Sequence, residues 1–202
     1  MADKYKNKYR ISSARLQSWD YGSNAMYFVT ICTQNRQHYF GEIINDEMQL
    51  SELGKHVEKE WLKTPDIRPD MNLELDTFVV MPNHFHGIIG IGKNEYNMQR
   101  GSERRDAMHR VSTTTTNANT NATTPDNQTE YTNQFGPQSK NLASIIRGFK
   151  SSVTTYARKN NLEFEWQPRF HDHIIRDDKS YKNIVNYIIT NPQNWETDKF
   201  RN

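Results

Sequence analysis

The fold is set by a hairpin in residues 73–91, LELDTFVVMPNHFHGIIGI. Apolar and polar side chains alternate over residues 73–80, which predicts a strand with one buried face. Pro82 and Asn83 are typical of a turn, and the apolar-rich residues 84–91 predict a second strand. We therefore expect these two strands to pair with each other as a hairpin.

Upstream of the hairpin, the sequence predicts a strand, a shorter strand candidate and a helix. Residues 25–33, AMYFVTICT, are rich in β-branched and aromatic side chains and predict the strand, and residues 38–44 are the shorter candidate. Ser51 is a typical N-cap residue, and Pro65 ends the helical pattern that follows it. The apolar positions of that pattern have helical spacing: Leu53, Val57, Trp61 and Leu62.

Downstream of the hairpin, Ser139 is expected to cap a long helix over residues 139–159. Its apolar stripe consists of Leu142, Ile145, Ile146, Phe149, Val153 and Tyr156. Residues 170–176 are a short strand candidate. Asp177 or Asp178 is then expected to cap a last helix, which ends before Pro192.

The order of these elements is β-α-β-β-α-β followed by a terminal helix, which is typical of the ferredoxin-like split βαβ pattern. The sequence therefore predicts an α+β fold with a ferredoxin-like antiparallel sheet. A length of 202 residues suits one domain over residues 1–202. Residues 95–137 are too polar to bury the apolar surface that would offset their ordering entropy, so they are expected to form a disordered or loosely ordered insert.

Composition excludes several classes of protein. No run approaches the ~20 apolar residues that a membrane-spanning helix needs, and the start MADKYKNKYR lacks the apolar region of a secretory signal. The single cysteine, Cys32, cannot form an internal disulfide and lies in the apolar run YFVTIC, which favours a buried thiol in a reduced, cytoplasmic protein. The net charge of +2 is weak evidence for any partner.

His84 and His86 are candidates for metal binding. Residues i and i+2 of a strand share a face, so the two imidazoles would lie side by side as half of a divalent-metal site. The same spacing also suits two polar residues on a half-exposed strand. His171 and His173 form a rival pair around Asp172, and composition cannot choose between the two pairs.

Tyr187 and Asn191 are four residues apart on the predicted terminal helix and therefore share a face. Together they could offer a phenolic nucleophile and an amide oxygen for a metal. Alternatively, Tyr187 is a core aromatic, and Asn191 before Pro192 is an ordinary helix terminator.

Basic and acidic residues are concentrated in different segments. Residues 139–159 contain no acidic residue and residues 1–15 contain Asp3 alone, whereas residues 42–78 are rich in Asp and Glu. Such asymmetry can present a positive surface to phosphates, although a solvated helix face has the same pattern. The basic side chains of residues 139–159 are Lys140, Arg147, Lys150, Arg158 and Lys159.

Four segments in order carry a family resemblance: YFVTICTQNRQHYFGEI (27–43), MPNHFHGII (81–89), KNLASIIRGFKSSV (140–153) and WQPRFHDHIIRDDKSYKNIVNYIITNP (166–192). Together they resemble the IS200-like single-tyrosine (Y1) transposases, and most closely the REP-associated tyrosine transposases. The resemblance implies the HUH endonuclease fold, in which two histidines flank a bulky hydrophobic residue on a central strand. It also implies a C-terminal catalytic helix.

For individual residues, the resemblance implies His84 and His86 as the metal-binding pair. It places the nucleophile at Tyr187, within VNYIITNP, and a third, polar metal ligand at Asn191 one helical turn later. His173 matches a position in the family's xxHxIR segment and is expected to be structural or close to DNA.

The implied activity is that of a single-stranded DNA endonuclease and strand transferase that uses Mg²⁺ or Mn²⁺ and forms a 5′-phosphotyrosine at palindromic repeats. The implied partner is hairpin DNA, bound by a monomer or homodimer in the cytoplasm, at the nucleoid. Arg147, Lys150, Arg169 and Arg176 are the candidates for phosphate contacts. The alternative is a non-catalytic DNA-hairpin-binding protein that retains the fold.

Overall fold

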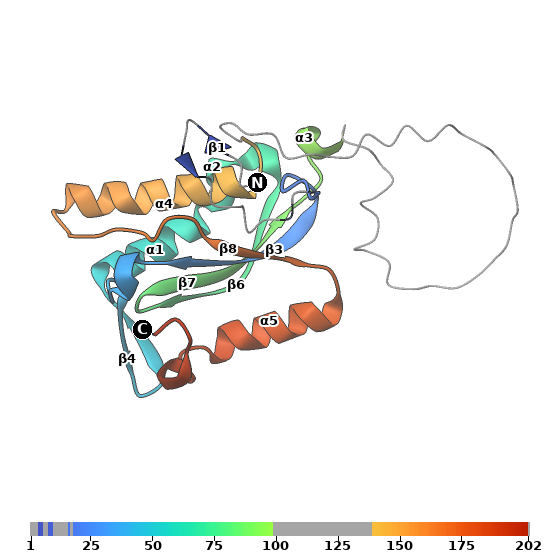
Figure 1. Cartoon of the computed structure of the whole chain (residues 1–202). Helices are drawn as coiled ribbons and strands as arrows, with labels where there is room; N and C mark the ends of the chain where they lie inside the picture. Colours follow the sequence, from blue (N-terminus) through green and yellow to red (C-terminus); the bar gives the residue numbers. More distant parts are fainter. Residues whose placement is uncertain (1–3, 6–7, 10–15, 17, 99–138, 202) are drawn as a thin grey trace, which may run out of the picture. The chain divides into compact units, whose positions relative to one another are not determined.

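The structure of the chain is a computed structural model that describes residues 4–5, 8–9, 16, 18–98 and 139–201. The chain divides into two compact units, formed by residues 1–20 with 113–137 and by residues 21–112 with 138–202. In the first unit, β1 (Lys4–Tyr5) pairs antiparallel with β2 (Lys8–Tyr9). All the other elements belong to the second unit (Figure 1).

The main sheet has four antiparallel strands: β3 (Ala25–Cys32), β6 (Leu73–Met81), β7 (His84–Ile91) and β8 (His171–Ile175). Their order across the sheet is β6-β7-β3-β8, so its first and third strands along the chain lie at the centre. This is the strand order of a ferredoxin-like sheet, which confirms the predicted α+β fold. The predicted hairpin consists of β6 and β7, with Met81 paired to His84 across the turn.

Helices cover both faces of this sheet. The three long ones are α1 (Glu52–Leu62), α4 (Leu142–Lys159) and α5 (Asp178–Thr190). The first two lie on one face and α5 lies on the other (Figure 1). Successive side chains of β7 point to opposite faces. Phe85 packs against Trp61 of α1 with ring centroids 4.7 Å apart, whereas Ile88 packs with Ile188 of α5.

The helix caps show which local signals the chain uses. Ser51 caps α1 as predicted, because its side chain accepts a hydrogen bond from the backbone N–H of Gly54. Asp177 caps α5 in the same way. The predicted cap of the long helix, Ser139, is wrong: Asn141 is the N-cap of α4. Its amide oxygen accepts from the backbone of Ser144, whose hydroxyl reciprocally accepts from the backbone of Asn141 in a capping box.

The strand candidate at 38–44 is a strand only in its last part. β4 (Gly41–Ile44) pairs with β5 (Glu47–Leu50), a strand that the sequence analysis did not predict, and the two form a separate hairpin. Asn45 and Asp46 connect them with φ angles of 51° and 64°, the left-handed conformation of a tight two-residue turn.

Short helices complete the fold: η1 (Gln34–Arg36), α2 (Thr64–Ile67), η2 (Pro69–Met71), α3 (Glu95–Met98) and η4 (Trp195–Thr197). α3 occupies the start of the predicted insert at 95–137. Its Asn97 is buried and donates hydrogen bonds to the carbonyls of Gly22 and Gly92. From residue 99 onward, the predicted insert lies outside the described residues.

Two expectations from composition can be compared with the structure. Among the described residues, none of the helices combines the length and the apolar character that crossing a membrane requires. Cys32 is buried at the end of β3 and is a free thiol, as predicted.

Candidate metal and tyrosine site

His84 and His86 lie on the face of β7 that α5 covers. Both side chains are fully buried, and their ring centroids are 4.5 Å apart. The Nδ1 atom of each ring is engaged, in His84 by Oδ1 of Asn83 and in His86 by Oγ1 of Thr30, both at 2.8 Å. Each ring therefore has only Nε2 left for a further partner.

Tyr187 reaches this pair from α5. Its hydroxyl lies 3.2 Å from Nε2 of His86, and the two ring centroids are 5.1 Å apart. Burial, and next the negative charge of Asp198, raise the pKa of Tyr187 to about 12. The hydroxyl is therefore protonated at neutral pH and must lose its proton before it can act as a nucleophile.

Asn191 is the C-cap residue of α5 and is buried. Its Nδ2 donates to Oδ2 of Asp198 at 3.0 Å. Because a carboxylate only accepts, this bond directs the amide oxygen of Asn191 away from Asp198. Within the described part of the chain, that oxygen and Nε2 of His84 are both buried without a hydrogen-bond partner.

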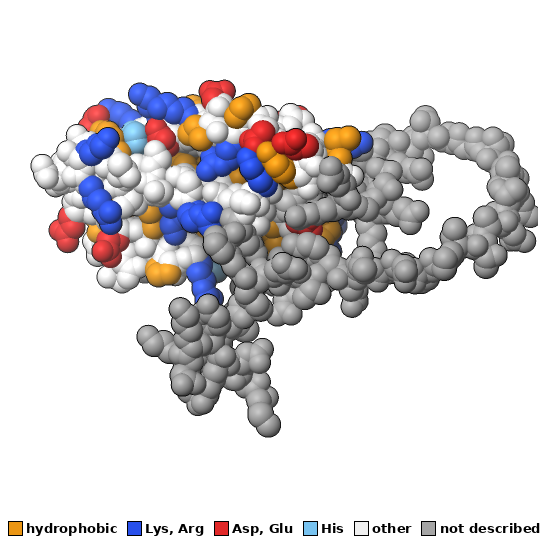
Figure 2. Space-filling model, turned by 90° about the horizontal axis from the view of Figure 1, so that it is seen from above, with side chains coloured by type: hydrophobic (Ala, Val, Ile, Leu, Met, Phe, Trp, Pro, Cys, Tyr) orange, Lys and Arg blue, Asp and Glu red, His pale blue; other side chains and the backbone are white. Residues whose placement is uncertain are grey.

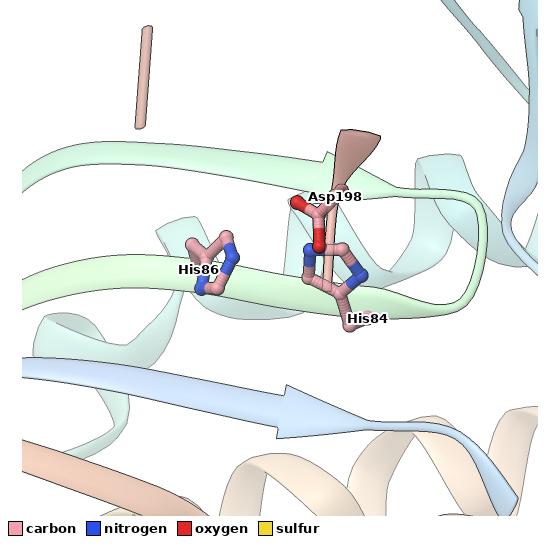
Figure 3. A group of neighbouring side chains, drawn as sticks. All are labelled: His84, His86 and Asp198. Carbon is pink, nitrogen blue, oxygen red and sulfur yellow. The ribbon is translucent and has the colours of Figure 1, made fainter. Parts of the chain in front are cut away.

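Asp198 belongs to the site, although the sequence analysis did not select it. Ligand atoms of His84, His86 and Asp198 lie within 4.8 Å of one another (Figure 3). The C-terminal segment brings the carboxylate here because the ring of Phe200 packs over both imidazoles, at 5.1 and 5.5 Å. No local pattern marks Asp198, because only this long-range packing distinguishes it from other acids near the terminus.

The donor set of this cluster suits a divalent cation. Burial lowers the pKa of His84 to about 3 and that of His86 well below its usual value, so both imidazoles stay neutral, as ligands must be. The positive charge of Arg36 also lowers the pKa of His84. The charges of His84 and then Lys199 lower the pKa of His86 further. Two imidazole nitrogens and a carboxylate oxygen could hold the ion, and the partnerless amide oxygen of Asn191 fits a further ligand.

The rival residues of the sequence analysis lie elsewhere. His171 and His173 are exposed on the edge strand β8, and Nε2 of His173 lies 3.4 Å from the hydroxyl of Ser180. Tyr181, the other tyrosine of α5, donates to Oδ2 of Asp76 at 2.7 Å. The structure therefore brings Tyr187, and not Tyr181, to the buried histidine pair.

The four residues predicted to contact phosphates do not surround this site. Arg147 and Lys150 belong to α4, on the other face of the sheet, where Lys and Arg side chains are visible in Figure 2. Nζ of Lys150 donates to the backbone carbonyls of Gln167 and Arg169, at 2.8 and 3.0 Å. Lys150 thereby attaches the exposed loop of Arg169 to α4.

Arg176 lies towards the opposite end of the sheet from His84. Ile175, the residue before it, pairs with Met26, whereas His84 pairs with Cys32. The rise along β3 from Met26 to Cys32 is about 20 Å. Arg176 and the histidine pair therefore lie towards different ends of the sheet.

Comparisons with known proteins support the architecture. No protein-family profile matches the chain. A curated protein of Haemophilus influenzae, described as uncharacterized, is 38% identical over 193 residues, which cover 93% of this chain and 91% of the relative. A solved structure of a REP-associated tyrosine transposase bound to a REP hairpin is similar with a TM-score of 0.51 and 19% identity. The match covers 91% of this chain and 73% of that chain, and it shows a common fold.

Proposed function

The chain belongs to the family of the Haemophilus influenzae protein and has a fold similar to that of a tyrosine transposase, and on this basis we propose a function. The proposed function is that of a metal-dependent endonuclease and strand transferase that acts on single-stranded DNA at palindromic repeats. The observation that carries the proposal is the 3.2 Å approach of the Tyr187 hydroxyl to His86, beside the donor cluster of His84 and Asp198. The hairpin bound by the structural neighbour supports DNA as the substrate.

In the proposed reaction, the hydroxyl oxygen of Tyr187 attacks a backbone phosphorus. The hydroxyl loses its proton, the bond between phosphorus and the 3′ oxygen breaks, and that oxygen takes up a proton. The products are a 5′-phosphotyrosine and a free 3′-OH. A 3′-OH can reverse the step, because the energy of the phosphodiester is retained in the protein–DNA bond, so joining needs no ATP.

His84, His86 and Asp198, with the amide oxygen of Asn191, would hold Mg²⁺ or Mn²⁺. When bound, the cation supplies positive charge that polarises the phosphate and favours the deprotonated tyrosine. The chain itself orients the groups. Thr30 holds the ring of His86, and the packing of α5 keeps the hydroxyl of Tyr187 at the histidine pair.

For DNA binding, we propose phosphate contacts by Arg147, Lys150, Arg169 and Arg176, which would position the strand without reading its sequence. We add Arg36 and Lys199, whose charges already act on the two histidines. The proposed protein is one domain over residues 1–202 with the polar insert at 95–137, and acts as a monomer or homodimer in the cytoplasm, at the nucleoid.

The test uses two versions of one single-stranded hairpin oligonucleotide, labelled at either the 3′ or the 5′ end, incubated with the full chain and Mn²⁺. A 5′-phosphotyrosine retains the 3′ fragment, so we expect an SDS-resistant protein band with the 3′ label. The 5′-labelled strand should be shortened and released. Tyr187→Phe should abolish the adduct, whereas Tyr181→Phe, which changes the other half-buried tyrosine of α5, should form it.

Three results would contradict the proposal. An adduct that carries the 5′ label would show the opposite polarity of attack. Binding of the hairpin with no adduct, unaffected by a chelator, would favour the non-catalytic alternative. The third result is that the His84→Ala/His86→Ala double variant retains cleavage and the His171→Ala/His173→Ala variant loses it. This result would show that the metal site lies on β8.

A further inference from the structure

Asn83, in the turn between β6 and β7, has a fully buried side chain with four polar neighbours. Its Nδ2 donates to the backbone carbonyls of Arg36, Phe200 and Arg201, at 3.2, 2.8 and 3.1 Å. Its Oδ1 lies 2.8 Å from Nδ1 of His84. One amide thus joins the loop after β3, the first residue of β7 and the C-terminal segment.

The three carbonyls determine which way the amide points. A carbonyl only accepts hydrogen bonds, so the NH₂ group of Asn83 must face Arg36, Phe200 and Arg201. Its oxygen therefore faces His84. Because that oxygen can only accept and lies 2.8 Å from Nδ1, it favours the tautomer of His84 that has the hydrogen on Nδ1 and the lone pair on Nε2.

A second amide is oriented in the same manner on the other side of the site. Asp198 accepts from Nδ2 of Asn191, so Oδ1 of Asn191 is left as an acceptor. Within the described residues, this oxygen and Nε2 of His84 have no hydrogen-bond donor. Two buried lone pairs without a donor are the arrangement that a cation satisfies.

Asn83 also binds the segment that carries Asp198. The carbonyls of Phe200 and Arg201 that it binds follow Asp198 closely in the chain. The backbone N–H of Phe200 in turn donates to Oδ1 of Asp198. The side chain that orients one histidine therefore also docks the segment that carries the carboxylate.

We propose that Asn83 is the positioning residue of this site: it selects the Nδ1–H tautomer of His84 and docks the segment of Asp198, so that the binding of a divalent cation depends on it. The inference rests on the proposed function for the role of the cation. The tautomer can be measured without any metal.

The side chain of Asn83 can be changed while its backbone stays anchored. The carbonyl of Asn83 accepts from both the backbone N–H and the hydroxyl of Thr33, each at 2.9 Å. Asn94 is a matched control, because it is a buried asparagine whose Nδ2 also donates to two carbonyls, those of Met71 and Gly92. It lies beyond the far end of β7 from His84.

The experiment compares wild type, Asn83→Ala and Asn94→Ala as full chains. Imidazole ¹⁵N NMR of the metal-free proteins reports the tautomer of His84, and electron paramagnetic resonance of Mn²⁺ reports affinity. In Asn83→Ala, the imidazole hydrogen should move to Nε2, where Oδ1 of Asn191 can accept it. The dissociation constant for Mn²⁺ should rise about 10–100-fold, the range for losing a partner of a metal ligand. Asn94→Ala should change neither the tautomer of His84 nor the affinity for Mn²⁺.

Asn83→Asp is a second variant in case the alanine variant does not fold. Its carboxylate retains an acceptor for His84 and should keep the Nδ1–H tautomer, but it offers no donor to the three carbonyls, so Mn²⁺ should still bind more weakly. An Nε2–H tautomer in wild type, or an unchanged tautomer and affinity in Asn83→Ala, overturns the proposal. A wild type that has the Nδ1–H tautomer but binds no Mn²⁺ contradicts the metal site of the proposed function and upholds the tautomer assignment.

Discussion

The hydroxyl of Tyr187 lies 3.2 Å from Nε2 of His86, although the two residues are 101 positions apart in the sequence. Packing on both sides of the tyrosine creates this proximity. Phe28 of β3 lies edge-on to the tyrosine ring, and Ile188 next to it is buried against Ile88 and Ile175. The distance between the Tyr187 hydroxyl and His86 therefore depends on how the whole of α5 docks on the sheet.

Replacing Tyr187 with Phe should separate chemistry from stability. The variant loses the proposed nucleophile and one hydrogen bond of a half-buried hydroxyl, so the free energy of unfolding should fall by about 1 kcal/mol or less. Urea unfolding measures this change, and covalent-adduct formation measures the chemistry. A variant that loses more than about 3 kcal/mol would show that the tyrosine is chiefly a core residue.

Asp198→Asn should weaken metal binding, because an amide oxygen replaces a charged carboxylate ligand. We expect the dissociation constant for Mn²⁺ to rise at least about tenfold. Glu196→Gln is the matched control: this exposed acid belongs to the same C-terminal segment and pairs with Arg201. Equal affinities of Asp198→Asn and Glu196→Gln would remove Asp198 from the ligand set.

The two buried histidines should make the fold less stable in mild acid. Burial lowers the pKa of His84 to about 3, whereas in the unfolded chain it titrates near the ordinary value of about 6.5. Between these values the unfolded chain binds more protons, so the free energy of unfolding falls as pH falls from about 6.5 towards 3. One such histidine contributes a slope of up to ~1.4 kcal/mol per pH unit.

Urea unfolding at about pH 7, 6 and 5 measures this slope. In His84→Gln the slope should be smaller than in wild type, whatever the absolute stability of the variant. Identical slopes in the two proteins would mean that His84 is not protected from protonation in the folded state.

Tyr181→Phe should loosen the docking of α5 while it leaves Tyr187, the proposed nucleophile, in place. Burial alone would raise the pKa of Asp76, but hydrogen bonds from Tyr181 and Thr77 hold it below its usual value. These bonds therefore stabilise the fold above the unfolded pKa of about 3.9, and the stabilisation is lost as pH falls through the lower folded pKa.

We expect the Tyr181→Phe variant to lose about 1–2 kcal/mol at neutral pH, the cost of leaving a half-buried carboxylate one donor short. The difference from wild type should shrink as pH falls through the lowered folded pKa of Asp76, because a protonated carboxyl depends less on the donor that the variant lacks. A difference that is independent of pH would show that the lost stability comes from packing rather than from the carboxylate.

Gly87 leaves little room for a side chain. A Cβ there would lie 2.8 Å from the ring of Phe85 and 3.0 Å from that of Trp61, in the layer between the sheet and α1. We expect Gly87→Ala to lower the free energy of unfolding by about 1–3 kcal/mol through overpacking. At Gly90, on the same strand, the nearest atom to an added Cβ is 3.6 Å away. Gly90→Ala should therefore be nearly neutral in the same measurement, and equal losses would refute the steric explanation.

Much of the fold was accessible from local patterns. The strand over residues 73–80, the turn at Pro82 and Asn83, and the cap at Ser51 each concern neighbouring residues, and the structure has all three. The predicted alternation with one buried face does not hold along the strand, because the pairing of β6 with β7 shifts register between Leu75 and Phe78 and helices cover both faces of the sheet. The incorrect cap at Ser139 had a local cause, because Asn141 offers a capping box with Ser144 that competes for the same helix start.

Only part of the site could be predicted from local sequence patterns. Strand and helix periodicity place His84 with His86, and Tyr187 with Asn191, on shared faces, but periodicity does not say which faces meet. Tyr181 and Tyr187 both lie on α5, and only the docking of that helix brings Tyr187 to His86 and Tyr181 to Asp76.

The sequence by itself thus determined the strands of the main sheet, the three long helices, their order and the two residue pairs, because each of these depends on spacing along the chain. Tertiary structure alone decided that Asp198 joins the histidines and that Asn83 orients one of them. Both depend on a C-terminal segment that folds back over the site, where Phe200 packs on the imidazoles and its carbonyl accepts from Asn83. Contacts between residues so far apart leave no periodic mark in a sequence, because they are stabilised by burial and hydrogen bonds that exist only once the sheet and its helices have assembled.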